Sequence, residues 1–413
     1  MNNADLIIAT LKANGVTRGF GIPSGNVLPL MEAMRQGGVE FVLTAHEGSA
    51  GFAADVTGRM TGAPGLCVAT LGPGATNLAT GVGGAFLDRS PLIAITCNLN
   101  TDQLGRRIQM WIDHHALFKP ITKATLKLKP GCVAETVTQA IALALSEPKG
   151  PVHLDLPEDV ALAATNEELE SPAQAGKLAA APDAALARAA ELIAAAERPI
   201  AVLGATAMRV ADPQLLRNVI ERHNLPFATT TMAKGMIDED HPLSLGCIER
   251  ACRQLQRKFL RSADLIVGLG YDTVEVEYEA WIGDRPLLQI DIEPVDVAPS
   301  VNLVHQVSGD FRWRGSTRCR PPPTNGTGRP SRSIGAAFTP RCVPRPSRSR
   351  RMPRSTRYAV HCRARGCLPS TSARTRIRSR ANGARMRPRP STSPRLVVHG
   401  KPSRGVTQNS SQH

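Results

Sequence analysis

Short apolar runs alternate with helix-like segments along the first 311 residues of this chain. The runs are rich in Val, Ile, Leu and Ala, as in GLCVAT (65–70) and PLIAIT (91–96). Strands separated by helices form a parallel sheet that is covered by helices on both faces, so the sequence predicts an α/β fold. In the first part we expect strands at 16–22, 40–45, 65–70, 91–96 and 151–156, and helices at 4–14, 26–36, 48–61, 75–87 and 134–146.

A second α/β pattern follows a polar, Ala-rich segment that contains two Pro residues. This segment has the composition of a linker. We therefore predict two parallel-sheet domains, 1–164 and 184–311, joined by a linker at 165–183. In the second domain we expect strands at 199–205, 226–231, 263–270 and 286–292, and helices at 184–196, 213–223 and 250–261.

The composition changes at Arg312. Residues 312–413 contain 24 Arg, one Lys (Lys401), 13 Pro and no Asp or Glu, which leaves 25 of the 50 basic and all 35 acidic residues to the body. The body therefore has a net charge of −10, and the pI near 9.9 reflects the tail alone. Because the tail has too few apolar residues to form a core, we predict that it is disordered.

Four loops of the first domain follow predicted strands: GIPSGN (21–26), AHEGSAG (45–51), TLGPGATN (70–77) and LGRRIQMWIDHHALF (104–118). Ligands of open α/β sheets bind at the carboxyl ends of the strands, so these loops form the candidate site. Taken alone, Glu47 is more typical of a helix N-terminal acid than of a catalytic group. The sequence has no Walker loop, HExxH or G-x-S-x-G motif, which argues against the common nucleotide, zinc-protease and serine-hydrolase classes.

The order of GFGIPSGNVLPL, AHEGSAGFAADVTGRMTGAPGLCVATLGPGATN and DHHALFKPITK closely resembles the pyrimidine-binding domain of thiamine-diphosphate enzymes. Within that family, the chain looks most like acetolactate synthase catalytic (large) subunits. TTTMAKGMIDEDHPLSLG (229–246) and QIDIEP (289–294) extend the resemblance to a Rossmann-like central domain that ends near Phe311. The resemblance implies decarboxylation and carboligation of 2-oxo acids, with pyruvate converted to acetolactate.

The resemblance also assigns roles to residues. It makes Glu47 the glutamate that hydrogen-bonds N1′ of the cofactor's aminopyrimidine. It places Gln109 near the family's substrate-side glutamine, although the alignment with the family allows a shift of one residue here. The vicinal pair His114 and His115 departs from synthases and resembles decarboxylases, so a 2-oxo acid decarboxylase-type lyase stays open. The residues expected to line the cofactor, in addition to Glu47, are Ile22, Pro23, Gly25, Thr70, Gly72, Gly74 and Asn77.

The third domain of the family carries a Gly-Asp-Gly motif and an Asn that hold Mg²⁺ on the diphosphate, and the sequence contains no GDG. We therefore expect a pyrimidine half-site without a Mg²⁺ or diphosphate site, and a chain that is inactive by itself. The resemblance of 202–209 and 268–279 to flavin-independent members leads us to expect no FAD. It also implies a homodimer or homotetramer formed through the first domain.

We interpret the tail as a shifted reading frame, because Arg, Pro and Ser without acids are typical of a GC-rich sequence read out of phase. Two alternatives remain: a basic arm that binds nucleic acid, which its three aromatic residues do not favour, and a non-catalytic partner of an intact homologue. Asp5 and the lack of a basic N-terminal region argue against a signal peptide, and no apolar run is long enough to span a membrane. With five dispersed Cys in the body, these features predict a cytoplasmic protein.

Overall fold

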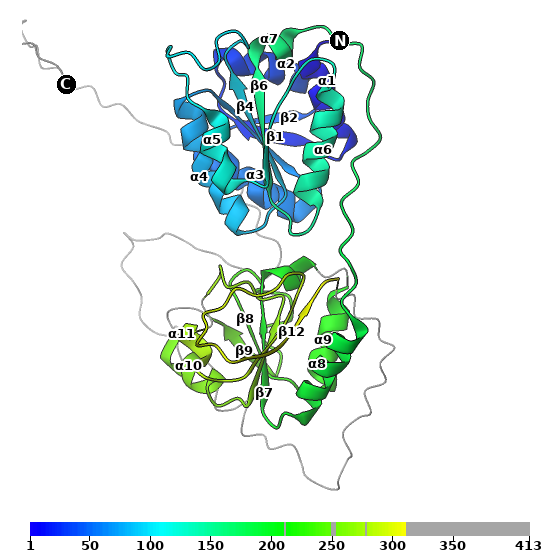
Figure 1. Ribbon diagram of the computed structural model, residues 1–413, viewed down its shortest axis with the longest axis vertical. Coiled ribbons are helices and arrows are strands. Elements are labelled where there is room, and N and C mark those ends of the chain that lie inside the picture. Colours follow the sequence, from blue (N-terminus) through cyan, green and yellow to red (C-terminus); the bar gives the residue numbers. More distant parts are fainter. Residues whose placement is uncertain (210–211, 249–252, 277–278, 311–413) are drawn as a thin grey trace, which may run out of the picture. The chain divides into compact units, whose positions relative to one another are not determined.

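The computed structural model describes residues 1–209, 212–248, 253–276 and 279–310, which form two α/β domains (Figure 1). The elements of the first domain are α1 Asn3–Ala13, β1 Arg18–Gly21, η1 Gly25–Val27, α2 Leu28–Gly37, β2 Glu40–Leu43, α3 Glu47–Thr61, β3 Gly65–Thr70, α4 Pro73–Leu87, β4 Leu92–Asn98, α5 His114–Phe118, η2 Lys119–Ile121, β5 Ala124–Lys127, α6 Val133–Leu145, β6 Pro151–Pro157 and α7 Glu158–Leu162.

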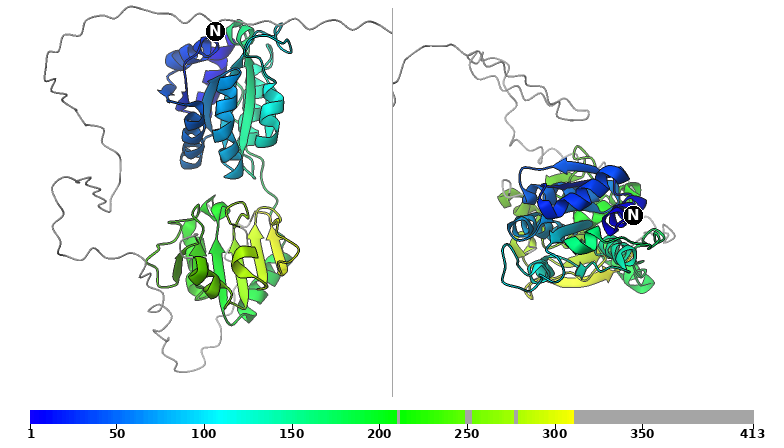
Figure 2. Two further views of the ribbon diagram at one scale, coloured as in Figure 1. Left: turned by 90° about the vertical axis from the view of Figure 1, so that its left-hand side faces the viewer. Right: turned by 90° about the horizontal axis from the view of Figure 1, so that it is seen from above.

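The strands of the first domain form one parallel sheet in the order β2-β1-β3-β4-β6-β5. Alternate side chains of β3 enter different cores: Leu66 and Val68 pack with α1, α2 and α6, whereas Cys67 and Ala69 pack with α3 and α4. Helices lie on either side of the sheet in Figure 1, and the left view of Figure 2 looks onto one of these helical layers. The sheet is therefore buried on both faces, which explains why its central strands are apolar without a polar face.

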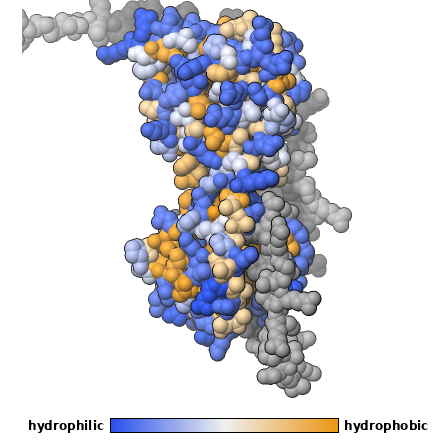
Figure 3. Space-filling view, turned by 45° about the vertical axis from the view of Figure 1, so that its right-hand side comes forward, coloured by the Kyte–Doolittle hydropathy of each residue, from blue (hydrophilic) through white to orange (hydrophobic). Residues whose placement is uncertain are grey.

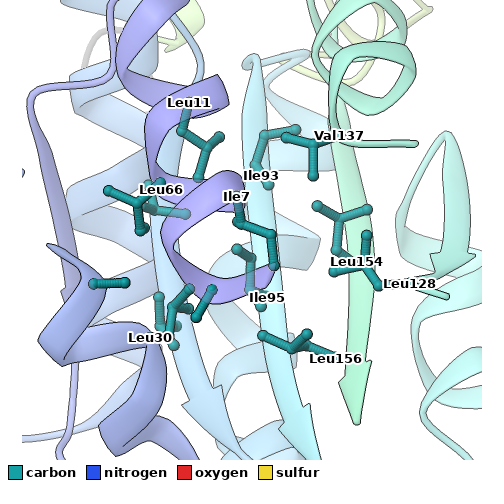
Figure 4. Close-up of a cluster of buried hydrophobic side chains, with 14 of the residues drawn as sticks. Ile7, Leu11, Leu30, Leu66, Ile93, Ile95, Leu128, Val137, Leu154 and Leu156 are labelled. Atoms are coloured by element: carbon teal, nitrogen blue, oxygen red, sulfur yellow. The ribbon is translucent and has the colours of Figure 1, made fainter. Parts of the chain in front are cut away.

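The larger core of this domain lies between the sheet and helices α1, α2 and α6. In Figure 4, Ile7 and Leu11 of α1 point toward Ile93 of β4. All three side chains are fully buried. Each contributes about 1.5–3 kcal/mol relative to an exposed side chain.

Helices α3 and α4 approach closely because glycines face each other at their crossing. A Cβ atom on Gly81 would lie 2.6 Å from Gly51 Cα and 2.7 Å from the Gly48 carbonyl oxygen. No side chain fits in this space, so the two backbones set the distance between the helices. The contact brings the N-terminal turn of α3 beside the first turns of α4.

The second domain is a separate parallel sheet with the order β12-β11-β10-β7-β8-β9. When β7 is counted as the first strand of the domain, this is the doubly wound strand order of Rossmann-type domains. The direction of the strand order reverses between β7 and β10, which is the switch point. Its elements are α8 Asp183–Ala195, β7 Pro199–Leu203, η3 Ala205–Arg209, α9 Pro213–Arg222, β8 Phe227–Thr229, β9 Ser244–Cys247, α10 Arg253–Leu260, β10 Leu265–Leu269, α11 Glu279–Ile282, β11 Leu287–Asp291 and β12 Leu303–Ser308.

The predicted fold class of two parallel-sheet α/β domains is confirmed. The sequence patterns missed the short strands β5 and β9, the terminal strand β12 and the short helices α5 and α7, because a run of four to six residues carries little periodicity. The tail predicted at 312–413 lies outside the described residues. Of the segment 165–183 expected as a linker, residues 165–182 lie between α7 and α8 and form no helix or named strand, and Asp183 is the first residue of α8.

The surface of the described residues is mixed in character. Figure 3 shows one face, on which hydrophilic residues predominate and hydrophobic residues gather in patches. None of the helices in the described ranges has the length and hydropathy that crossing a bilayer requires.

Candidate functional site

Glu47 lies at the carboxyl end of β2, as the first residue of α3. Its side chain is 8% exposed, and its Oε2 accepts a hydrogen bond from Asn77 Nδ2 at 3.0 Å. The turn before it is held by His46, whose Nδ1 accepts from the Gly48 amide at 3.0 Å. The carboxylate is thus buried at the sheet edge and oriented by α4.

Gly74 leaves space beside the second carboxylate oxygen. A Cβ atom at this position would lie 3.5 Å from Glu47 Oε1 and 2.7 Å from Thr70 Cγ2. The backbone of α4 can therefore come this close to Thr70 only because residue 74 has no side chain, whereas the distance to Glu47 would be an ordinary contact. Three of the residues predicted from the sequence, Glu47, Thr70 and Gly74, thus meet at one point.

The loop after β1 reaches the same point through Ser24. Ser24 Oγ donates to Thr70 Oγ1 at 3.0 Å, which joins the ends of β1 and β3. Of the predicted lining residues in this loop, Ile22 is half-buried, whereas Pro23 and Gly25 are exposed. The polar contact made by Ser24 was not predicted; its position between Pro23 and Gly25 was the available signal.

Gly72 begins α4 in a conformation that other residues rarely adopt, with φ of 60° and ψ of −118°. A Cβ atom here would lie 2.5 Å from the carbonyl oxygen of Met110. Gln109, the predicted substrate-side residue, is exposed in the adjacent loop. Among the described residues, no hydrogen bond joins Gln109 to the group around Glu47, whereas its neighbour Met110 contacts Gly72.

His114 and His115 begin α5, after the N-cap Asp113. His114 is buried, and its Nε2 accepts a hydrogen bond from the Gly72 amide at 3.4 Å. The side chain of His115 is 38% exposed. A hydrogen bond with Asp155 raises the pKa of His115 above its ordinary value.

Four polar residues that sequence reasoning missed lie beneath this pair: Thr96 and Asn98 on β4, and His153 and Asp155 on β6. In each strand the two polar residues are two positions apart, so they lie on the same face of the sheet, and the other residues of the strand are apolar or Cys. This spacing in LIAITCN and PVHLDLP could have identified them from the sequence. Burial lowers the pKa of His153 to about 3. Burial by itself would raise the pKa of Asp155, but hydrogen bonds from His114, His115 and Asn98 hold it well below its usual range.

At the switch point of the second domain, the loops after β7 and β10 contact each other. The Glu275 carboxylate accepts hydrogen bonds from the Ala205 amide, at 2.8 Å, and from Thr230 Oγ1, at 3.0 Å. A Cβ atom on Gly204 would lie 2.3 Å from Tyr271 Cα, so the loops after β7 and β10 are in contact. The amide that a dinucleotide phosphate would take in a Rossmann domain is thus bonded to a carboxylate of the same domain.

Three acidic side chains of the second domain are buried or largely buried. Burial raises the pKa of Glu275 to about 7 and the pKa of Asp291, at the end of β11, to about 6. Asp272 is also buried, at 8% exposure. In the described part of the chain, no group of three or more His, Cys, Asp or Glu side chains has the arrangement of a metal site.

The first domain is a doubly wound α/β domain with a buried carboxylate and glycine-rich turns at the carboxyl edge of its sheet. The second domain has the strand order of Rossmann-type domains. Together these features indicate a class of cofactor-dependent proteins. Residues 1–117 match the thiamine pyrophosphate enzyme N-terminal TPP binding domain, and residues 186–313 match the thiamine pyrophosphate enzyme central domain. The chain belongs to this family, and the resemblance drawn from its motifs is confirmed.

The chain is similar to curated proteins that are named acetolactate synthase. The chain is 34% identical to a probable acetolactate synthase large subunit of Methanocaldococcus jannaschii, over 76% of this chain and 54% of the relative. It is 32% identical to an acetolactate synthase of Bacillus subtilis (strain 168), over 74% of this chain and 55% of the relative. The chain thus spans about half the length of the curated relatives it matches.

Proposed function

We propose that the first domain holds the aminopyrimidine of thiamine diphosphate, with Glu47 as the carboxylate that binds N1′. The burial of Glu47 at a strand end carries this proposal. Its Oε2 is held by Asn77, while its Oε1 lies beside Gly74, which has no side chain. When bound, the cofactor supplies the carbon nucleophile and the electron sink that 2-oxo acid decarboxylation requires. Glu47 would hold or move the proton at N1′ in a site from which water is largely excluded.

The reaction that we propose is decarboxylation and carboligation of 2-oxo acids, with two pyruvates giving acetolactate. The names of the relatives support it. Because no GDG motif for Mg²⁺ occurs in the sequence, we propose that the chain is inactive by itself. The 2-oxo acid, Mg²⁺ and the diphosphate would then need groups that this chain does not supply.

We propose that residues 312–413 are read in a shifted frame, on the evidence of their 24 Arg and absence of acids. Translation of the other two frames after codon 311 tests this. A frame that encodes GDG followed by an Asn supports it. Two frames without that motif overturn it, and the basic arm would then be tested by the binding of labelled RNA to the full chain across a salt series.

The activity is tested with three proteins: the full chain, the chain with the alternative frame restored, and the restored chain with Glu47→Gln. We expect acetolactate from pyruvate only with the restored chain, and a loss of about 10²–10⁴-fold in the Glu47→Gln variant. A restored chain that binds thiamine diphosphate and Mg²⁺ but forms no acetolactate would overturn the synthase assignment.

A decarboxylase-type lyase is the second candidate, because of the pair His114 and His115. The burial of His114 weighs against its contact with a substrate, whereas His115 is partly exposed. The product distinguishes the two reactions. Acetaldehyde from pyruvate that falls in a His115→Gln variant would favour the lyase, and acetolactate would favour the synthase.

We further propose that the central domain works without a flavin and that the protein is a homodimer or homotetramer formed through the first domain. The Glu275 carboxylate on the Ala205 amide supports the first point. An apolar stripe supports the second: Phe52, Val56 and Met60 lie one turn apart on α3 and are 47–80% exposed. Such a patch is typical of a protein interface.

A further inference from the structure

A buried polar network lies where β4 and β6 end. Thr96 of β4 is in register with Asp155 of β6, and Asn98 and His153 lie on the same face of the sheet. All four side chains are at most 3% exposed. Polar side chains are stable at such depth only when they bond one another, so the network constrains each of its members.

Asp155 contacts both histidines of α5 at once. Its Oδ1 lies 3.4 Å from His114 Nδ1, and its Oδ2 lies 3.5 Å from His115 Nε2. Asn98 Nδ2 donates to the same Oδ1 at 2.9 Å. A single carboxylate therefore orients two consecutive side chains that leave the helix in different directions.

The hydrogen bonds of His114 define where its proton lies. The Gly72 amide can only donate, so Nε2, at 3.4 Å from it, must accept. A neutral imidazole then carries its proton on Nδ1, which faces Thr96 Oγ1 at 2.9 Å and the Asp155 carboxylate. Asn98 Nδ2 also lies 3.3 Å from Nδ1, but this amide has the shorter bond, at 2.9 Å, to Asp155 Oδ1. Because a carboxylate only accepts, Asp155 favours this tautomer over the other.

The position of the Gly72 amide affects the groups that surround Glu47. Gly72 is the N-cap residue of α4, and because it has no side chain it cannot cap the helix with a side-chain hydrogen bond. The next turns of α4 place Gly74 beside Glu47 and supply the Asn77 amide that bonds the Glu47 carboxylate. A shift of Gly72 would therefore move both groups that surround Glu47.

We propose that Asp155 is a positioning residue of the Glu47 site, which acts by holding His114 in the Nδ1-protonated tautomer so that its Nε2 fixes the Gly72 turn. The identity of the ligand at Glu47 rests on the proposed function. The positioning role concerns only residues of this chain.

Hydrogen exchange of the full chain, read by mass spectrometry, tests the proposal in Asp155→Asn. We expect exchange in 70–78 to rise by about tenfold or more, with α1 and α6 unchanged. Asp159→Asn is the matched control: Asp159 lies four residues further on, and its Oδ1 accepts from the Thr101 amide at 3.0 Å, outside the network. Exchange in 70–78 that matches the control, or that rises equally throughout the domain, would overturn the proposal.

The tautomer is read directly from ¹⁵N shifts of the full wild-type chain labelled at histidine, which requires no variant to fold. We expect His114 with its proton on Nδ1, and a proton on Nε2 would overturn the proposal. Neither readout needs a ligand. A failure to bind thiamine diphosphate would thus count against the proposed function and leave the positioning role to be decided by these two measurements.

Discussion

Asn77 donates a hydrogen bond to Glu47 across the contact between α4 and α3, at 3.0 Å. The two residues are thirty positions apart, and they meet because the glycines at 51 and 81 let the two helix backbones touch. The partner of the candidate catalytic carboxylate is therefore a consequence of close helix packing.

Replacement of Asn77 by Ala should destabilise the first domain by about 1.5–3 kcal/mol, because it leaves a buried carboxylate without its donor. Thr76→Ala is the control, since Thr76 is exposed and bonds only the Pro73 carbonyl within its own helix. Urea unfolding followed by circular dichroism measures both. Equal losses would mean that the contact with Glu47 contributes nothing.

Gly72→Ala should cost at least about 2 kcal/mol, because φ is positive and the added Cβ would lie 2.5 Å from the Met110 carbonyl oxygen. Gly25→Ala, in the neighbouring loop, places a Cβ with nothing within 4 Å. We expect the control to change stability by less than about 0.5 kcal/mol. Thermal unfolding of the two variants decides, and a Gly72→Ala protein as stable as the control would contradict the structure.

Glu275→Gln should make stability less dependent on pH. Burial raises the pKa of Glu275 from 4.5 to about 7, so the folded state binds more protons than the unfolded state between these values. Wild-type stability therefore falls as pH rises through this window, and the variant avoids this loss. The stability of the variant relative to wild type should increase by on the order of 2 kcal/mol from pH 5 to pH 8.

Urea unfolding at the two pH values provides the test, with Glu135→Gln, at an exposed position of α6, as control. The control should show the same pH dependence as wild type. A Glu275→Gln protein that follows wild type at both pH values would show that this carboxylate is not desolvated.

Binding of FAD by wild type would separately contradict the proposal of a flavin-free central domain.

Val56→Glu combined with Met60→Glu should dissociate the homodimer or homotetramer that we propose, because charges placed in an apolar interface lose their hydration. The two side chains are 50% and 80% exposed, so the change should leave the fold of the monomer intact. Light scattering after gel filtration measures the mass. Leu255→Glu, at a 58% exposed position of α10 in the other domain, is the control and should leave the mass unchanged.

Local patterns were enough for the long elements and for the place of the site. The strand β3 and the first four residues of β4 are continuous apolar runs because both faces of the sheet are covered, and the sequence alone shows this pattern. Glu47, Gly72 and Gly74 were predicted as cofactor-binding residues from the family resemblance, and the structure places them in turns at strand ends. The short strand β5 had no such apolar pattern, since its residues are only half-buried.

By itself, the amino-acid sequence determined the α/β class, the succession of two parallel-sheet patterns and the family, because periodicity and motifs are local properties of the chain. Only the tertiary structure decided which groups bond to one another. Asp155 meets His114 and His115 through strand register, Glu275 reaches the Ala205 amide through the contact of two loops, and Asn77 reaches Glu47 through helix packing. Hydrogen bonds between residues distant in sequence depend on the packing of elements, which no local pattern encodes.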